Sequence, residues 1–169
     1  MGATFVVIPS NAEEAEPEHL TPHEMCRANA YRKALSIARL HPDHLVLGAD
    51  TLVFLGTRVY AKPNSLEEAK RMLRELSGRT HHVITGVCLV HHRVERTELF
   101  SESTAVTFKT LSGEDIEDYL SRMNPLDKAG AYAIQEHGDR IVAAVEGSYS
   151  NVVGLPMERV SLAVTAALS

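Results

Sequence analysis

The stretch HLVLGADTLVFLG at residues 44–56 places a single acid between two apolar runs. Each run has the length and the Val, Leu and Phe content that are typical of buried β-strands. A carboxylate at such a place is costly, because an unpaired charge is strongly disfavoured in an apolar interior. Asp50 therefore either caps a turn between the strands or has a role that offsets this cost, and Thr51 adds a hydroxyl beside it.

Four helices are predicted by their start signals. Thr21 to Glu24, read as TPHE, form a capping box with Pro at the first helical position, and this box predicts a helix that runs to about Leu40. The segments NSLEEAKRMLREL and SGEDIEDYLSRM begin with similar capping signals and carry an apolar stripe at helical spacing. Pro156 opens the last predicted helix, PMERVSLAVTAAL.

Strands are predicted by the apolar runs between these helices. THHVITGVCLVHHRV and ELFSESTAVTFKTL read as an antiparallel ribbon, and shorter strands are predicted at TFVVI, GAYAIQ, RIVAAVEG and YSNVVG. Helices and strands alternate along the chain, yet several strand pairs have the spacing of hairpins. The pattern therefore predicts one α/β domain over residues 1–169, with a central mixed β-sheet flanked by helices.

Composition excludes two classes of partner. The net charge is −5 and no run of Lys or Arg forms a basic stripe, which argues against binding to nucleic acid. No apolar run approaches the ~20 residues of a membrane span. The N-terminal residues lack the basic region of a secretory signal, so the cytoplasm is the expected location.

Several charged side chains stand near predicted strand or helix ends. Asp50 lies near the end of a buried strand, where ligands collect in open α/β sheets. Lys62 precedes Pro63, which favours an extended backbone and presents the lysine at a strand end. Lys33 lies on the first predicted helix and Glu14 in the acidic segment before it. Each lysine could equally be a solvated surface residue.

The polar groups together favour chemistry on phosphates. Gln135 closes the GAYAIQ segment and could read hydrogen bonds on a base edge, while Ser150 and Asn151 lie in the loop GSYSNVVGLP. Two carboxylates suit a divalent metal, two lysines suit phosphates, and the set fits phosphoanhydride chemistry better than acyl transfer. The chain has no GxSxG, GxGxxG or Walker sequence, so a serine hydrolase or a Rossmann enzyme is not supported.

Several of these segments resemble the Maf family of nucleoside triphosphate pyrophosphatases. The resemblance runs from about Phe5 to the C-terminus and rests on GADT, KP, LSGRTHHVITGV, PLDKAGAYAIQ and GSYSNVVGLP, in that order. It implies an elongated α/β fold with a cleft between two lobes. It also implies hydrolysis between the α- and β-phosphates of a nucleotide, with Mg²⁺ or Mn²⁺ as the cofactor and a nucleoside triphosphate as the partner.

The resemblance assigns roles to matching positions. Asp50 matches the proton acceptor of the family, and Glu14 matches the acid that ends the family's VIPS…E segment. Our hypothesis is that Glu14 and Asp50 share the divalent metal. Thr51 and Gln135 match positions tied to base preference, and the glutamine is similar to the subgroup that acts on dTTP and UTP. Lys33 and Lys62 match the two lysines that lie on the phosphate side of the family's active site.

One part of the family pattern is not matched. Family members begin with a strand and an S-x-S-P-R-R turn that opens a helix, whereas this sequence starts at MGATFVVIPS. The expectation is a chain without this phosphate-binding β–α unit. Two alternatives therefore stay open, a nucleotide-binding or interaction protein without catalysis, and a pyrophosphatase for inosine-type nucleotides. A homodimer is compatible with the resemblance, although no sequence feature demonstrates one.

Overall fold

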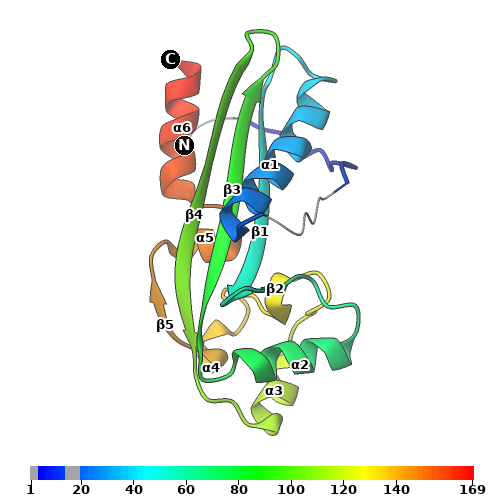
Figure 1. The fold of residues 1–169 in the computed structure, drawn as a ribbon, viewed down its shortest axis with the longest axis vertical. Helices are drawn as coiled ribbons and strands as arrows, with labels where there is room; N and C mark the ends of the chain where they lie inside the picture. Colours follow the sequence, from blue (N-terminus) through cyan, green and yellow to red (C-terminus); the bar gives the residue numbers. More distant parts are fainter. Residues whose placement is uncertain (1–3, 14–19) are drawn as a thin grey trace. The chain divides into compact units, whose positions relative to one another are not determined.

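The computed structural model describes residues 4–13 and 20–169, and these residues belong to two compact units. Unit 1 contains Met1–Asp50, Thr85–Glu102 and Gly154–Ser169, and unit 2 contains Thr51–Ile84 and Ser103–Val153. The elements in chain order (Figure 1) are α1 Pro22–Ala38, β1 Leu45–Leu55, β2 Arg58–Tyr60, α2 Leu66–Leu76, β3 Thr80–His91, β4 Arg96–Phe108, α3 Gly113–Leu120, η1 Ala129–Ala131, α4 Gly138–Ile141, β5 Val142–Glu146, α5 Tyr149–Val153 and α6 Met157–Leu168.

The strands form one sheet in the order β2-β1-β3-β4-β5. The pairs β1 with β2 and β4 with β5 are antiparallel, and the arrows of β1, β3 and β4 alternate in direction in Figure 1. The α/β class predicted from the sequence is confirmed. The sheet is antiparallel, however, rather than mixed, because β1 joins β2 and β3 joins β4 through short turns, which connect antiparallel neighbours.

Two helices cover opposite faces of the sheet in unit 1. Alternate residues of β3 point to opposite faces. Cys88 and Val90 pack with α1, while Val87 and Leu89 pack with α6. The predicted capping box starts α1, since the hydroxyl of Thr21 accepts a hydrogen bond from the backbone N–H of Glu24. The burial of β3 on both faces explains why its sequence is an almost unbroken apolar run.

The α1 helix lies very close to the strand backbones of unit 1. A Cβ atom at Gly86 would lie 2.3 Å from the backbone of Cys26, and one at Gly48 would lie 2.6 Å from the carbonyl oxygen of Ala30. Atoms do not approach so closely without a shift, so only glycine fits at these two strand positions. The small side chains Ala30, Ala34 and Ala38 form the helix side of the same contact.

Unit 2 has a core of larger side chains. The helix α2 packs on both α3 and η1, with Leu73 and Leu76 of α2 fully buried. Three aromatic side chains lie in the core of the same unit. The ring of His81 lies edge-on to the rings of Phe108 and Tyr132, at centroid distances of 4.7 and 5.4 Å, and its Nε2 is hydrogen-bonded to the Tyr132 hydroxyl at 2.8 Å.

Three predicted strands are wrong. The TFVVI segment has no regular secondary structure, and Phe5, Val6 and Val7 are exposed. GAYAIQ forms the 3-10 turn η1 and a loop, because Gly130 and Ala131 both adopt positive φ angles, which no strand allows. YSNVVG forms the short helix α5. In RIVAAVEG the first residues belong to α4, and only Val142–Glu146 pair as β5.

Candidate functional site

Asp50 lies in the middle of β1 with its side chain toward α1. It is 6% exposed, and it lies two residues after Gly48, so both face the same side of the strand. Gly48 contacts α1 directly, as described above, and Asp50 continues this contact one step along the strand. Thr51 is partly buried and points to the other face of β1.

Two side chains of α1 bind the two carboxylate oxygens of Asp50. Lys33 Nζ lies 2.6 Å from Oδ1 and forms an ion pair with it. Asn29 Nδ2 donates a hydrogen bond of 3.2 Å to Oδ2. Residues four apart lie on the same face of a helix, so one face of α1 supplies both donors. The predicted position near a strand end is wrong, because Asp50 lies in the middle of β1, and its carboxylate binds α1 rather than capping a turn.

The two donors differ in their surroundings. Asn29 is 3% exposed, whereas the Lys33 side chain is 24% exposed. The lysine therefore retains contact with solvent while its ammonium group pairs with Asp50. The ion pair therefore lies between the buried carboxylate and solvent, where a charged ligand could reach the ammonium group.

Sequence reasoning missed Asn29. Asn is uncommon in the interior of helices and is favoured at caps, because its side chain competes for backbone hydrogen bonds. The signal that could have found it was its position four residues before Lys33 in the middle of a strongly predicted helix. Nothing in the sequence alone shows that this helix face meets Asp50.

The described residues supply one carboxylate to this site. Among the residues described, no group of three or more His, Cys, Asp and Glu side chains could hold a metal ion by itself. Glu14, the second predicted metal ligand, lies outside the described residues. An ionised carboxylate has about four lone-pair positions, so Asp50 retains acceptor capacity beyond its bonds to Lys33 and Asn29.

Lys62 follows β2 in unit 2, next to the buried Pro63, and is exposed. The pKa of Asp127 is lowered, first by a hydrogen bond from Lys128 and to a smaller extent by the positive charge of Lys62. The loop that carries Lys62 is held to η1, because the Gly130 N–H donates to the carbonyl oxygen of Ala61. A fixed backbone thus presents this lysine to solvent.

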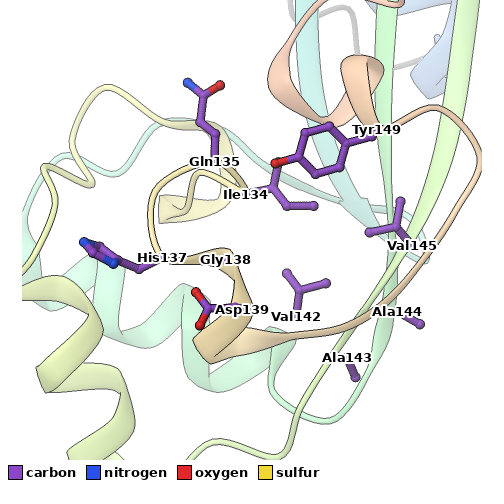
Figure 2. Close-up of a pocket in the computed structure, with 10 residues that line it drawn as sticks. All are labelled: Ile134, Gln135, His137, Gly138, Asp139, Val142, Ala143, Ala144, Val145 and Tyr149. Atoms are coloured by element: carbon purple, nitrogen blue, oxygen red, sulfur yellow. The ribbon is translucent and has the colours of Figure 1, made fainter.

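Gln135 is exposed in the turn that leads to α4. It lines an open pocket of unit 2, with an empty volume of ≈ 770 Å³ that includes open solvent. Figure 2 shows the amide group extending away from Val142 and Val145, while the hydroxyl of Tyr149 points toward Ile134. The amide is therefore available to a ligand that approaches from outside this pocket.

Asn151 is fully buried in unit 2 and makes internal hydrogen bonds. Its Nδ2 donates to the carbonyl oxygen of Val83 and to Thr104 Oγ1, both at 3.0 Å. The hydroxyl of Ser150 lies 2.9 Å from that of Ser148. These contacts hold α5 to β3 and β4, and the sequence-based assignment of Ser150 and Asn151 to substrate binding stays a prediction.

None of the helices in the described part of the chain is long and apolar enough to cross a bilayer.

Known proteins resemble this chain over nearly its whole length. The family described as "Maf-like protein" matches residues 1–167. A protein of Akkermansia muciniphila named "dTTP/UTP pyrophosphatase" is 44% identical over 163 residues, which cover 94% of this chain and 83% of the relative. Proteins of the same name from Pelotomaculum thermopropionicum and Bacillus cereus are 42% and 43% identical, over 95% and 92% of this chain and 84% and 80% of their own length. This chain therefore belongs to the Maf family.

Proposed function

We propose that this chain is a nucleoside triphosphate pyrophosphatase that hydrolyses dTTP and UTP to the monophosphate and pyrophosphate. Relatives at 42–44% identity are named for this activity. The observation that carries the proposal is the buried carboxylate of Asp50, paired with Lys33 Nζ at 2.6 Å. A buried acid with a solvent-reaching lysine beside it is costly for stability alone and suits acid–base work on a charged substrate.

The roles of the residues follow from their chemistry. Asp50 accepts the proton of the water that attacks the α-phosphorus. Lys33 and Lys62 offset the negative charge that develops on the phosphates during the displacement. Pyrophosphate leaves with the electron pair of the broken phosphorus–oxygen bond, and the nucleoside monophosphate retains the new oxygen.

A divalent ion, Mg²⁺ or Mn²⁺, fits the donor set of this site. Mg²⁺ is typically bound by one or two carboxylates together with substrate phosphates and water, rather than by a cage of protein ligands. Asp50 is such a carboxylate, and Glu14 is proposed as the second. When bound, the ion would neutralise charge on the phosphate oxygens.

Base preference is assigned to Gln135, with Thr51 in support. The thymine and uracil edge presents carbonyl oxygens that accept hydrogen bonds and an N3–H that donates one. A Gln amide can donate and accept at the same time, whereas a carboxylate can only accept. An exposed amide at Gln135 is therefore matched to a pyrimidine of this kind.

The test of the activity is a panel of nucleoside triphosphates incubated with the full chain and Mg²⁺ or Mn²⁺. The proposal expects pyrophosphate and monophosphate in equal amounts, with dTTP and UTP turned over fastest. Faster turnover of ITP would instead support the inosine-type alternative. Nucleotide binding without pyrophosphate release would refute the enzymatic proposal and support a binding protein.

The test of the base preference is Gln135→Glu. The carboxylate would face the carbonyl oxygens of the base, so we expect kcat/KM for dTTP to fall at least about tenfold, the equivalent of one hydrogen bond. Glu136→Gln is the matched control on the next residue of the same turn and should leave kcat/KM within about twofold. Equal values for Gln135→Glu and the unchanged chain would remove Gln135 from the proposed site.

A further inference from the structure

We propose that Asn29 is a positioning residue that fixes Oδ2 of Asp50, so that Oδ1 is the oxygen that accepts the proton from the attacking water. The inference deepens the proposed function and rests on it. Its starting point is the pair of bonds from α1 to Asp50, with Lys33 Nζ on Oδ1 at 2.6 Å and Asn29 Nδ2 on Oδ2 at 3.2 Å.

The two bonds differ in how readily they can be exchanged. Asn29 has a short side chain with two rotatable bonds and is 3% exposed, so its amide is held in place by the surrounding helix and strand. Lys33 has a long flexible stem and is 24% exposed, so its ammonium group can turn to another anion. The phosphates of a nucleoside triphosphate carry several negative charges, so they compete with Asp50 Oδ1 for this ammonium group.

This difference makes the carboxylate asymmetric when substrate binds. Lys33 moves its contact from Oδ1 to the phosphates, while Asn29 retains Oδ2. The carboxylate can then not rotate about its Cβ–Cγ bond, and Oδ1 is left as the acceptor that faces the substrate. The close packing of α1 on β1 at Gly48 and Ala30 keeps the Asn29 amide at this distance.

One bond forms and one bond breaks at phosphorus in this step. The water oxygen bonds to the α-phosphorus as the bond from that phosphorus to the bridging oxygen breaks. One water proton passes to Asp50 Oδ1, and the electron pair of the broken bond leaves with pyrophosphate. Asn29 retains its protons throughout and acts only by holding Oδ2.

The first test is Asn29→Leu, which keeps the number of side-chain heavy atoms and removes the donor. We expect kcat for dTTP to fall about tenfold to a hundredfold, the usual effect of losing a hydrogen bond to a charged group, with KM within about twofold. Lys33→Met should change both constants, because the proposal places Lys33 on the phosphates. Cys26→Ala is the matched control, one turn earlier on the same buried face of α1, and should leave both constants unchanged.

Unfolding in urea checks that each variant is folded, and Asn29→Ala replaces Asn29→Leu if the latter does not fold. The second test combines the change with Asp50→Asn. A residue that acts only through Asp50 loses its effect once the carboxylate is gone, so the double variant should equal Asp50→Asn alone.

The outcomes separate the two proposals. No pyrophosphate release by the unchanged chain overturns the proposed function and the role of Asn29 with it. Release by the unchanged chain, with an equal kcat for Asn29→Leu, overturns the role of Asn29 alone. Equal loss of kcat in both the Asp50 and Asp50→Asn backgrounds also overturns it, because Asn29 would then act by a route that does not involve the carboxylate.

Discussion

The two units of the molecule are packed by opposite means. In unit 1, α1 contacts the strands through alanines and glycines, so the helix backbone lies very close to the strand backbones. In unit 2, leucines and aromatic rings fill a thicker core between the helices and the sheet. The candidate proton acceptor lies in the first kind of packing. Short side chains such as Asn29 can reach a strand carboxylate only where the helix approaches this closely.

The comparison indicates what each unit tolerates. Added volume should be the damaging change in unit 1, because neither backbone can move away without shifting the residues around Asp50. Lost volume should be the damaging change in unit 2, because an emptied site among large side chains leaves a cavity. The predictions below are ordered by the size of the effect that this difference implies.

The largest effect is expected for Gly86→Ala in unit 1. The new Cβ would lie 2.3 Å from the Cys26 backbone and would force α1 away from β3. We expect a loss of unfolding free energy above the roughly 1–3 kcal/mol that overpacking usually costs, measured by urea unfolding. Gly113→Ala is the control, since a Cβ there meets nothing within 4 Å. An unchanged midpoint for Gly86→Ala would contradict the close packing of α1.

A somewhat smaller effect is expected for Leu73→Ala in unit 2. Leu73 is fully buried among the residues of the large core, and its truncation should cost about 3 kcal/mol of unfolding free energy. Leu66→Ala on the same helix is the matched control, because Leu66 is 53% exposed and should change stability by less than about 0.5 kcal/mol. Equal losses for the two variants would show that α2 does not bury the face described.

The smallest effect is a pH dependence of the free energy of unfolding, which should arise in unit 2. Burial lowers the pKa of His81 from its usual 6.5 to about 4, and His82 contributes in the same direction. Between these pH values the unfolded chain binds a proton at His81 and the folded chain does not. Stability therefore falls as the pH falls from 6.5 toward 4, by on the order of 2 kcal/mol.

The variant His81→Gln isolates this contribution. Its unfolding free energy should fall less steeply between pH 6.5 and pH 4.5 than that of the unchanged chain, whatever its stability at pH 7. His82→Gln should retain most of the slope, since burial is the larger cause of the lowered His81 pKa and the charge of the exposed His82 is the smaller one. The same slope in all three proteins would refute the assignment to His81.

The sequence predicted the elements whose signals are local. The helices α1, α2, α3 and α6 begin at or next to the capping residues or Pro that predicted them. The long ribbon of β3 and β4 was also correct. The segment between residues 129 and 153 was misjudged, because short apolar runs do not distinguish strands from turns and short helices. Positive φ angles at Ala131 and His137, which no sequence rule anticipates, decide its path.

The site was predicted in part. Asp50 was singled out because an acid interrupts an apolar pattern, and this signal needs no knowledge of the fold. The pairing of Asp50 with Lys33 depends on which face of α1 meets β1, and that face is set by Gly48 and Gly86 on two different strands. Asn29 was missed for the same reason. The sequence pattern of a helix or a strand predicts that element, but it does not predict which residues of another element will contact it.

The most direct test of the account is the rate of pyrophosphate release from dTTP by Asp50→Asn, with folding checked by urea unfolding. The substitution keeps the size of the side chain and removes its ability to take a proton. We expect kcat to fall about 10²–10³-fold or more, while the folded state remains populated. A folded Asp50→Asn variant that releases pyrophosphate at the rate of the unchanged chain would contradict the central claim that Asp50 accepts the proton.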